Sequence, residues 1–221
     1  MSKTKKLEKT IPRGRIVVIK GKPYWFVTES QERQLMSRAI NDLLTSGYDP
    51  HAVIAITKGG NFGMDLADDV LNVPYACIAS KHYKKGKKGQ LAKQVNKRVK
   101  LAEHFSTVSN LLKLLEVGKR VRLLIVDDLT DWGDTYVKLE FKLRQQFGHR
   151  FEMRTLCLWK KDRSTFRADF VGKVIHRHRA TGKYPWIITT EDQLFANAVK
   201  GVDQGLLRRY NRRRKKHQII M

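Results

Sequence analysis

Short apolar segments that alternate with amphipathic ones constrain the fold of this chain most. Four of these segments have no polar face, which is typical of strands buried on both sides of a parallel sheet. Between them, apolar residues recur at helical intervals. We predict strands at 52–57, 73–79, 121–126 and 153–159 and helices at 62–71, 101–115 and 135–147. This order predicts an α/β fold, a mostly parallel sheet flanked by helices, with ligands bound beyond the carboxyl ends of the strands.

A hairpin and a helix precede the first of these strands. Residues 15–20 and 24–27 are predicted to pair as two short strands around a turn that contains glycine and proline. Thr28 and Gln31 have the spacing of a capping box, in which each side chain bonds to the backbone N–H of the other residue. The helix that they begin is predicted to end at Gly47.

The length of 221 residues suits one domain with a sizeable core. We predict a basic flexible arm over residues 1–12, a single domain over 13–200 and a basic tail over 201–221. No apolar run approaches the ~20 residues of a membrane-spanning helix, and the N-terminal residues lack the apolar centre of a secretory signal. Cys77 and Cys157 lie in apolar runs, as reduced core thiols do. We therefore expect a cytoplasmic protein.

The charge balance is unusual, because 45 lysine and arginine residues outnumber 21 acidic residues and leave a net charge of +24. Such an excess favours RNA or DNA as a partner. Residues 81–100 are expected to form a mobile basic loop. The tail contains cations around one aromatic residue, a pattern that resembles an arginine-rich nucleic-acid contact. These residues are Arg208, Arg209, Tyr210, Arg212, Arg213, Arg214, Lys215 and Lys216. The alternatives to nucleic-acid binding are a solvated basic surface for the chain and a subunit-contact arm for the tail.

Acidic residues follow the third predicted strand. Asp127 and Asp128 come directly after it, Asp131 comes three residues later, and Gly133 lies at the turn that opens the next helix. Backbone N–H groups at such a turn bind phosphate, and carboxylates bind ribose hydroxyls directly or through Mg²⁺. An acidic pair after a strand, taken alone, favours a structural role such as loop capping. The glycine turn and the Lys-Gly-Gly sequence after residue 57 shift that preference towards a ligand site.

The segment from Val126 to Thr135 resembles the phosphoribosyl pyrophosphate-binding signature of the type I phosphoribosyltransferases. In that family a hydrophobic strand ends in two acids, followed by a spacer, an acid, Thr-Gly, any residue and Thr. The resemblance extends over about residues 24–186. Within it, Thr57–Gly60 is similar to the pyrophosphate loop, Leu158–Lys160 to the strand that meets the purine 6-oxo group, and Pro185–Ile188 to the base-stacking segment of purine enzymes that accept hypoxanthine, guanine or xanthine.

The resemblance implies a Mg²⁺-dependent transferase that joins the phosphoribosyl group of phosphoribosyl pyrophosphate to a purine base and releases pyrophosphate. Asp131 would be the catalytic general base near purine N7. Asp127 and Asp128 would bind the ribose hydroxyls and Mg²⁺. The basic segment 81–100 would take the place of the family's catalytic hood, and a homodimer is compatible with the family. Further substrate contacts would come from Lys58, Gly59, Thr130, Trp132, Gly133, Asp134, Thr135, Lys160 and Trp186.

Two residues depart from the family's signature. Trp132 stands where the family has Thr or Ser, and Asp134 stands where it has Lys, Gly or Arg. A bulky indole and an added carboxylate both disfavour a phosphate in this loop. The main alternative is therefore a catalytically weak or inactive protein of this fold that binds nucleic acid as a regulator or as a ribonucleoprotein component. Trp186 is equally compatible with an ordinary core aromatic residue, and Lys160 with a solvated strand end.

Overall fold

The computed structural model describes residues 14–57, 61–81, 100–101, 110–111, 120–190 and 192. These residues belong to two compact units, one formed by residues up to 32 together with those from 178 onward, and the other by residues 33–177. The domain limits predicted near 12 and 200 lie outside the described residues and stay predictions. Within the described part of the chain, no helix combines the length and the apolarity needed to cross a membrane. Cys77 and Cys157 carry reduced thiols and form no disulfide, as predicted.

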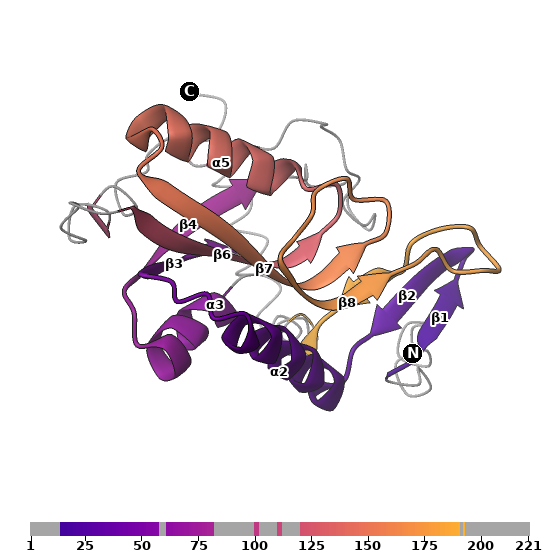
Figure 1. The fold of residues 1–221 in the computed structure, drawn as a ribbon. Helices are drawn as coiled ribbons and strands as arrows, with labels where there is room; N and C mark the ends of the chain where they lie inside the picture. The colour runs from indigo at the N-terminus through magenta and orange to yellow at the C-terminus, as the bar shows by residue number, and fades with distance from the viewer. Residues whose placement is uncertain are drawn as a thin grey trace, which may run out of the picture. The chain divides into compact units, whose positions relative to one another are not determined.

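The larger unit is built on a six-stranded sheet in which five neighbouring strands run parallel (Figure 1). The strand order is β5-β4-β3-β6-β7-β8, and the edge strand β5 pairs antiparallel with β4. The predicted fold class, a mostly parallel sheet flanked by helices, is confirmed. The strands are β3 (Ala52–Thr57), β4 (Tyr75–Lys81), β5 (Lys100–Leu101), β6 (Val121–Thr130), β7 (Phe151–Lys161) and β8 (Phe170–Ile175).

Alternate residues of the central strands face two separate cores, which explains why these strands are apolar throughout. Ile54 packs in one core with Leu139 of α5 (Asp134–Phe147). Its neighbour Val53 packs in the other core, to which α2 (Glu29–Thr45) contributes. Figure 1 shows α5 on one face of the sheet and α2 on the other. Both faces of the central strands β3 and β6 are therefore largely buried, and the acidic residues of β6 lie near its carboxyl end.

The helical segment after β3 begins as an α-helix but does not continue as one. It consists of α3 (Phe62–Asp65) and the π-helical η1 (Leu66–Leu71), and Asn72 ends it in the left-handed conformation with φ 49°. Gly63 packs directly against β6, since a Cβ added there would lie 2.8 Å from the Cβ of Val126. The helical stretch predicted over 62–71 is therefore confirmed, and the structure adds that its second part is π-helical.

The predicted bounds of several other elements also differ from the observed ones, as in β4, which was predicted over 73–79 and spans Tyr75–Lys81. The helix predicted over 101–115 is wrong at its start, because Leu101 pairs in β5; residues 110–111 are helical, and the rest of that range lies outside the described residues. Strands β6 and β7 are longer than their apolar runs and reach Thr130 and Lys161. They pair with each other beyond their apolar runs, because the ladder needs backbone groups and not apolar side chains.

The smaller unit contains a three-stranded sheet. The predicted hairpin is confirmed by antiparallel pairing of β1 (Ile16–Ile19) with β2 (Lys22–Phe26), and β9 (Trp186–Ile188) pairs parallel with β2. The capping box is also confirmed, because Gln31 N–H donates to Thr28 Oγ1 and Thr28 N–H donates to Gln31 Oε1, each at 3.2 Å. These reciprocal bonds fix the start of α2.

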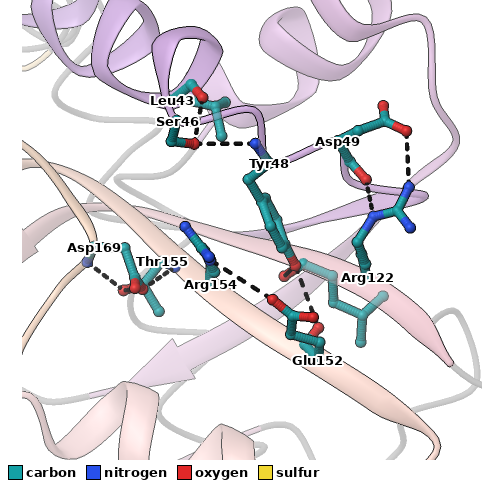
Figure 2. Close-up of polar contacts among 10 residues, drawn as sticks. Leu43, Ser46, Tyr48, Asp49, Arg122, Glu152, Arg154, Thr155 and Asp169 are labelled. Carbon is teal, nitrogen blue, oxygen red and sulfur yellow. Dashed lines mark hydrogen bonds and ion pairs between the residues drawn. The ribbon is translucent and has the colours of Figure 1, made fainter.

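A polar network at the amino end of the central sheet holds the connection between α2 and β3 (Figure 2). The Tyr48 hydroxyl donates to the carbonyl oxygen of Leu123 at 3.0 Å, and the Arg154 guanidinium lies 4.7 Å from the centre of the tyrosine ring. Burial is the largest of the effects that raise the pKa of Tyr48. Arg122 Nη2 binds Asp49 Oδ2 at 2.8 Å in the same connection. This network stabilises the end of the sheet opposite to the predicted ligand site.

Candidate functional site

The two adjacent acids lie within the last four residues of β6, not after its end as the apolar run predicts. Asp127 pairs in register with Cys157 of β7 and is only 8% exposed. Burial, followed by the negative charge of Asp128, raises the pKa of Asp127 well above its usual range. The backbone N–H of Asp128 donates to Asp127 Oδ1 at 3.0 Å. The pair therefore places two carboxyl groups side by side at the carboxyl end of the central sheet, where burial and their mutual repulsion disfavour the charged form of Asp127.

The turn between β6 and α5 depends on Gly133. This residue has φ 90°, a conformation that side chains with a Cβ rarely adopt, and its O accepts the backbone N–H of Val137 as α5 begins. A Cβ at position 133 would overlap the Cβ of Phe166. No side-chain hydrogen bond caps the helix at Gly133. Helix N-termini bind anions in other proteins through the amides of their first turn.

Phe166, in the loop after β7, packs against the start of α5. Its ring stacks on Tyr136 with the ring centres 4.8 Å apart and the planes at 9°. The Tyr136 hydroxyl donates in turn to the carbonyl oxygen of Leu156 on β7 at 3.3 Å. Because β6 and β7 are neighbours, the loops that follow them meet, and these aromatic contacts hold them together.

Asp131, in the loop between β6 and α5, is bound by two cations from the β7 side. Lys161 Nζ lies 2.9 Å from Oδ2, while Arg163 donates to Oδ1 from Nε at 2.7 Å and also from Nη2. The side chains of Asp131, Lys161 and Arg163 are 17%, 12% and 23% exposed. Burial lowers the pKa of Lys161, and the charge of Asp131 opposes that effect. This cluster, the Asp131 triad, carries two positive charges and one negative charge.

Trp132 points its ring towards the same arginine. The Arg163 guanidinium carbon lies 4.2 Å from the centre of the indole, within the range of a cation–π contact. Trp132 is 44% exposed, so its ring is not a core residue. The sequence indicated an indole that fills a phosphate loop, and the structure adds a specific partner for it.

The structure brings most of the predicted site residues together on one segment and its neighbouring strand. Lys160 pairs in register with Thr130, so it lies beside the end of β6. Trp186 lies in the smaller unit on β9 and is 41% exposed, unlike a core aromatic residue. Lys58, Gly59 and the basic tail lie outside the described residues. The residues of the continuous segment are Asp127, Asp128, Thr130, Asp131, Trp132, Gly133, Asp134 and Thr135.

Three residues of this region were not predicted as part of the site. They are Lys161, Arg163 and Phe166, all at the end of β7 or in the loop after it. The sequence held a clue to Lys161 and Arg163. A Lys-Lys-Asp-Arg sequence follows a predicted buried strand, and the neighbouring strand ends in acidic residues. Phe166 gave no such signal, since a single aromatic residue in a loop does not reveal its partner.

Comparison with known proteins identifies the fold. No protein-family model and no curated protein matches the chain. Among solved structures, a Helicobacter pylori xanthine-guanine-hypoxanthine phosphoribosyltransferase matches with a TM-score of 0.53 and 14% identity, over 80% of this chain and 98% of that one. A hypothetical protein from Neisseria gonorrhoeae with bound ppGpp matches with a TM-score of 0.51 and 20% identity, over 76% and 88%. The described chain has the type I phosphoribosyltransferase fold, as the resemblance in its sequence predicts.

Proposed function

We propose that this protein transfers the phosphoribosyl group of phosphoribosyl pyrophosphate to a purine base, forming a nucleoside monophosphate and pyrophosphate. The observation that carries the proposal is the β6–α5 connection. It combines an acidic strand end, an acid in the loop and a glycine turn at a helix N-terminus, in the fold of this enzyme family. One fold can host many activities. The proposal therefore rests on the residues of the β6–α5 connection and not on the fold alone.

Each part of the connection suits one part of the donor. Asp127 and Asp128 would accept hydrogen bonds from the ribose 2′- and 3′-hydroxyls. The amides from Thr130 to Thr135 and the Thr135 hydroxyl would bind the 5′-phosphate, as helix N-termini bind anions generally. By the resemblance, Lys58 and the Gly59 amide would bind the pyrophosphate.

Mg²⁺ fits this segment as an ion bound mainly by the substrate. The described residues contain no group of three or more His, Cys, Asp or Glu side chains that could hold a metal ion. Mg²⁺ bound to a phosphorylated substrate needs only one or two carboxylates, which Asp127 and Asp128 would supply. A nearby cation would also favour the charged form of Asp127, whose pKa is raised first by burial and then by the charge of Asp128. When bound, Mg²⁺ neutralises negative charge on the pyrophosphate.

The transfer breaks the bond from C1′ to pyrophosphate, whose electron pair leaves with the pyrophosphate, and forms a bond from a purine nitrogen to C1′. The sugar becomes cationic on the way, and the acidic pair would stabilise that charge. Asp131 would accept the proton that the purine loses, through N7. Lys160 would donate to the 6-oxo group, and Trp186 would stack on the base. The name of the Helicobacter pylori enzyme supports a purine of the xanthine, guanine or hypoxanthine type.

Nucleotide formation from phosphoribosyl pyrophosphate, Mg²⁺ and a set of bases tests the proposal. The set is guanine, hypoxanthine, xanthine, adenine and uracil, and the protein is first stripped of nucleic acid. Asp131→Asn should lower kcat by about 10²–10⁴-fold, the usual contribution of a general base. The matched control is Asp49→Asn, which removes an arginine-paired carboxylate at the opposite end of the sheet. Equal rates for the two variants would reject Asp131 as the base.

The net charge of +24 favours a second candidate, a protein of this fold that binds nucleic acid with little or no turnover. The Neisseria gonorrhoeae neighbour, which holds ppGpp, supports a nucleotide pocket on this fold without naming a reaction. Deletion of Arg208–Met221 should weaken RNA or DNA binding and reduce its salt dependence. Unchanged affinity would reject the tail as a contact. A cytoplasmic location and a homodimer remain part of the proposal, and sedimentation measures the second.

A further inference from the structure

We propose that Trp132 is a positioning residue that acts through Arg163 on Asp131, and that this contact restrains Asp131 until a purine base binds. The inference rests on the proposed function, because it concerns the group proposed as the general base. It gives a physical role to the residue that departs most from the family's signature. The small Thr or Ser of the signature has no aromatic face on which an arginine can stack.

Arg163 lies between Trp132 and Asp131 and contacts both side chains. The guanidinium of Arg163 lies 4.2 Å from the centre of the Trp132 ring, and the same group binds Asp131 Oδ1 from Nε at 2.7 Å and from Nη2. Stacking fixes the plane of a guanidinium, and that plane decides which of its N–H groups point at a carboxylate. The contact with the Trp132 ring therefore sets the orientation in which the Arg163 guanidinium binds the Asp131 carboxylate.

Trp132 is more exposed to solvent than the ion pair of Asp131 and Arg163, which fits a positioning role. Asp131 and Arg163 are 17% and 23% exposed, so their ion pair is partly shielded from water. Trp132 is 44% exposed and contributes little to the core. An exposed tryptophan that covers a shielded arginine stabilises the position of the arginine more than it stabilises the fold.

The restraint has a direct consequence for substrate. Lys161 holds Oδ2 of Asp131 at 2.9 Å, so both carboxylate oxygens already accept hydrogen bonds from cations. A purine that donates a proton to Asp131 has to share or displace one of these cations. Weakening the hold of Trp132 on Arg163 should therefore favour purine binding. A cation–π contact changes an equilibrium by about 2- to 30-fold, which sets the size of the expected effect.

Nuclear magnetic resonance of the arginine side chains tests the positioning step without substrate. In the natural protein, the indole should shift the Nε–H signal of Arg163 by its ring current and slow its exchange with water. Trp132→Leu should remove the shift and speed the exchange by about 2- to 30-fold, whereas Trp132→Phe should keep part of both. Phe141→Leu is the control, since Phe141 is an exposed aromatic on α5. An unchanged Arg163 signal in Trp132→Leu would overturn the inference.

Steady-state kinetics separate this inference from the proposed function. Trp132→Leu should lower KM for the purine by up to the same factor and leave KM for phosphoribosyl pyrophosphate less affected. A rise in KM for the purine would contradict the restraint on Asp131. If no base is turned over but Arg163 responds to Trp132, the positioning contact stands and the transferase proposal fails. If turnover occurs but Arg163 does not respond, the positioning contact fails alone.

Discussion

Replacing Gly133 with alanine perturbs the point at which the two loops of the candidate site touch. At φ 90°, a residue with a Cβ costs about 1–3 kcal/mol in backbone strain. The new Cβ would also overlap the Cβ of Phe166, and overpacking of this kind costs about 1–3 kcal/mol. We expect the free energy of unfolding to fall by about 2–6 kcal/mol, a large part of the stability of an ordinary protein.

Urea unfolding measures this loss, and with a slope of about 2 kcal/mol per molar the midpoint should fall by about 1–3 M. Gly47→Ala is the matched control, because Gly47 has φ 67° but no atom lies within 4 Å of an added Cβ; it should cost only the backbone strain, about 1–2 kcal/mol. In the Gly133→Ala background, Phe166→Gly should restore part of the stability and Phe166→Ala should not, since alanine keeps the overlapping Cβ. Equal losses for the two glycine variants would refute this reasoning.

Two further predictions concern stability away from the loop. Tyr48→Phe removes the hydroxyl that donates to the carbonyl of Leu123 and should cost about 1–3 kcal/mol in urea unfolding, whereas Tyr75→Phe, at an exposed tyrosine, should cost almost nothing. Burial raises the pKa of Cys157 from 9.0 to about 12, so the unfolded thiol ionises at lower pH than the folded one. Stability should therefore be unaffected below about pH 9 and fall towards pH 12 by at most about 1.4 kcal/mol per pH unit. Cys157→Ala should flatten this fall, and an unchanged slope would exclude the thiol as its cause.

Local patterns in the sequence predicted the parts of the fold that depend on local physics. The capping box of Thr28 and Gln31 and the apolar runs of β3 and β6 needed only spacing and hydrophobicity. The ends of β6 and β7 were missed because their polar residues stay in the ladder through backbone pairing with a neighbour. Which strands are neighbours is a tertiary property that the apolar run does not contain.

In the candidate site too, the sequence revealed the residues of one continuous segment but not their contacts with the neighbouring strand. The acids and the glycine turn lie on one continuous segment, so the signature was enough to find them. The two cations that bind Asp131 lie about thirty residues away on the next strand and its loop, and only the order of the strands brings them near. Trp132 was noticed because it broke the signature, but its partner Arg163 became evident only from the structure.

The most direct test of the proposed function is a phosphorus magnetic resonance spectrum of the natural protein with phosphoribosyl pyrophosphate, Mg²⁺ and each purine base in turn. For at least one purine, the donor signals should decay while pyrophosphate and a nucleoside 5′-monophosphate grow in equal amounts. Asp131→Asn should slow this conversion. Donor signals that stay unchanged with every base, in protein shown to be folded and free of nucleic acid, would contradict the transferase activity.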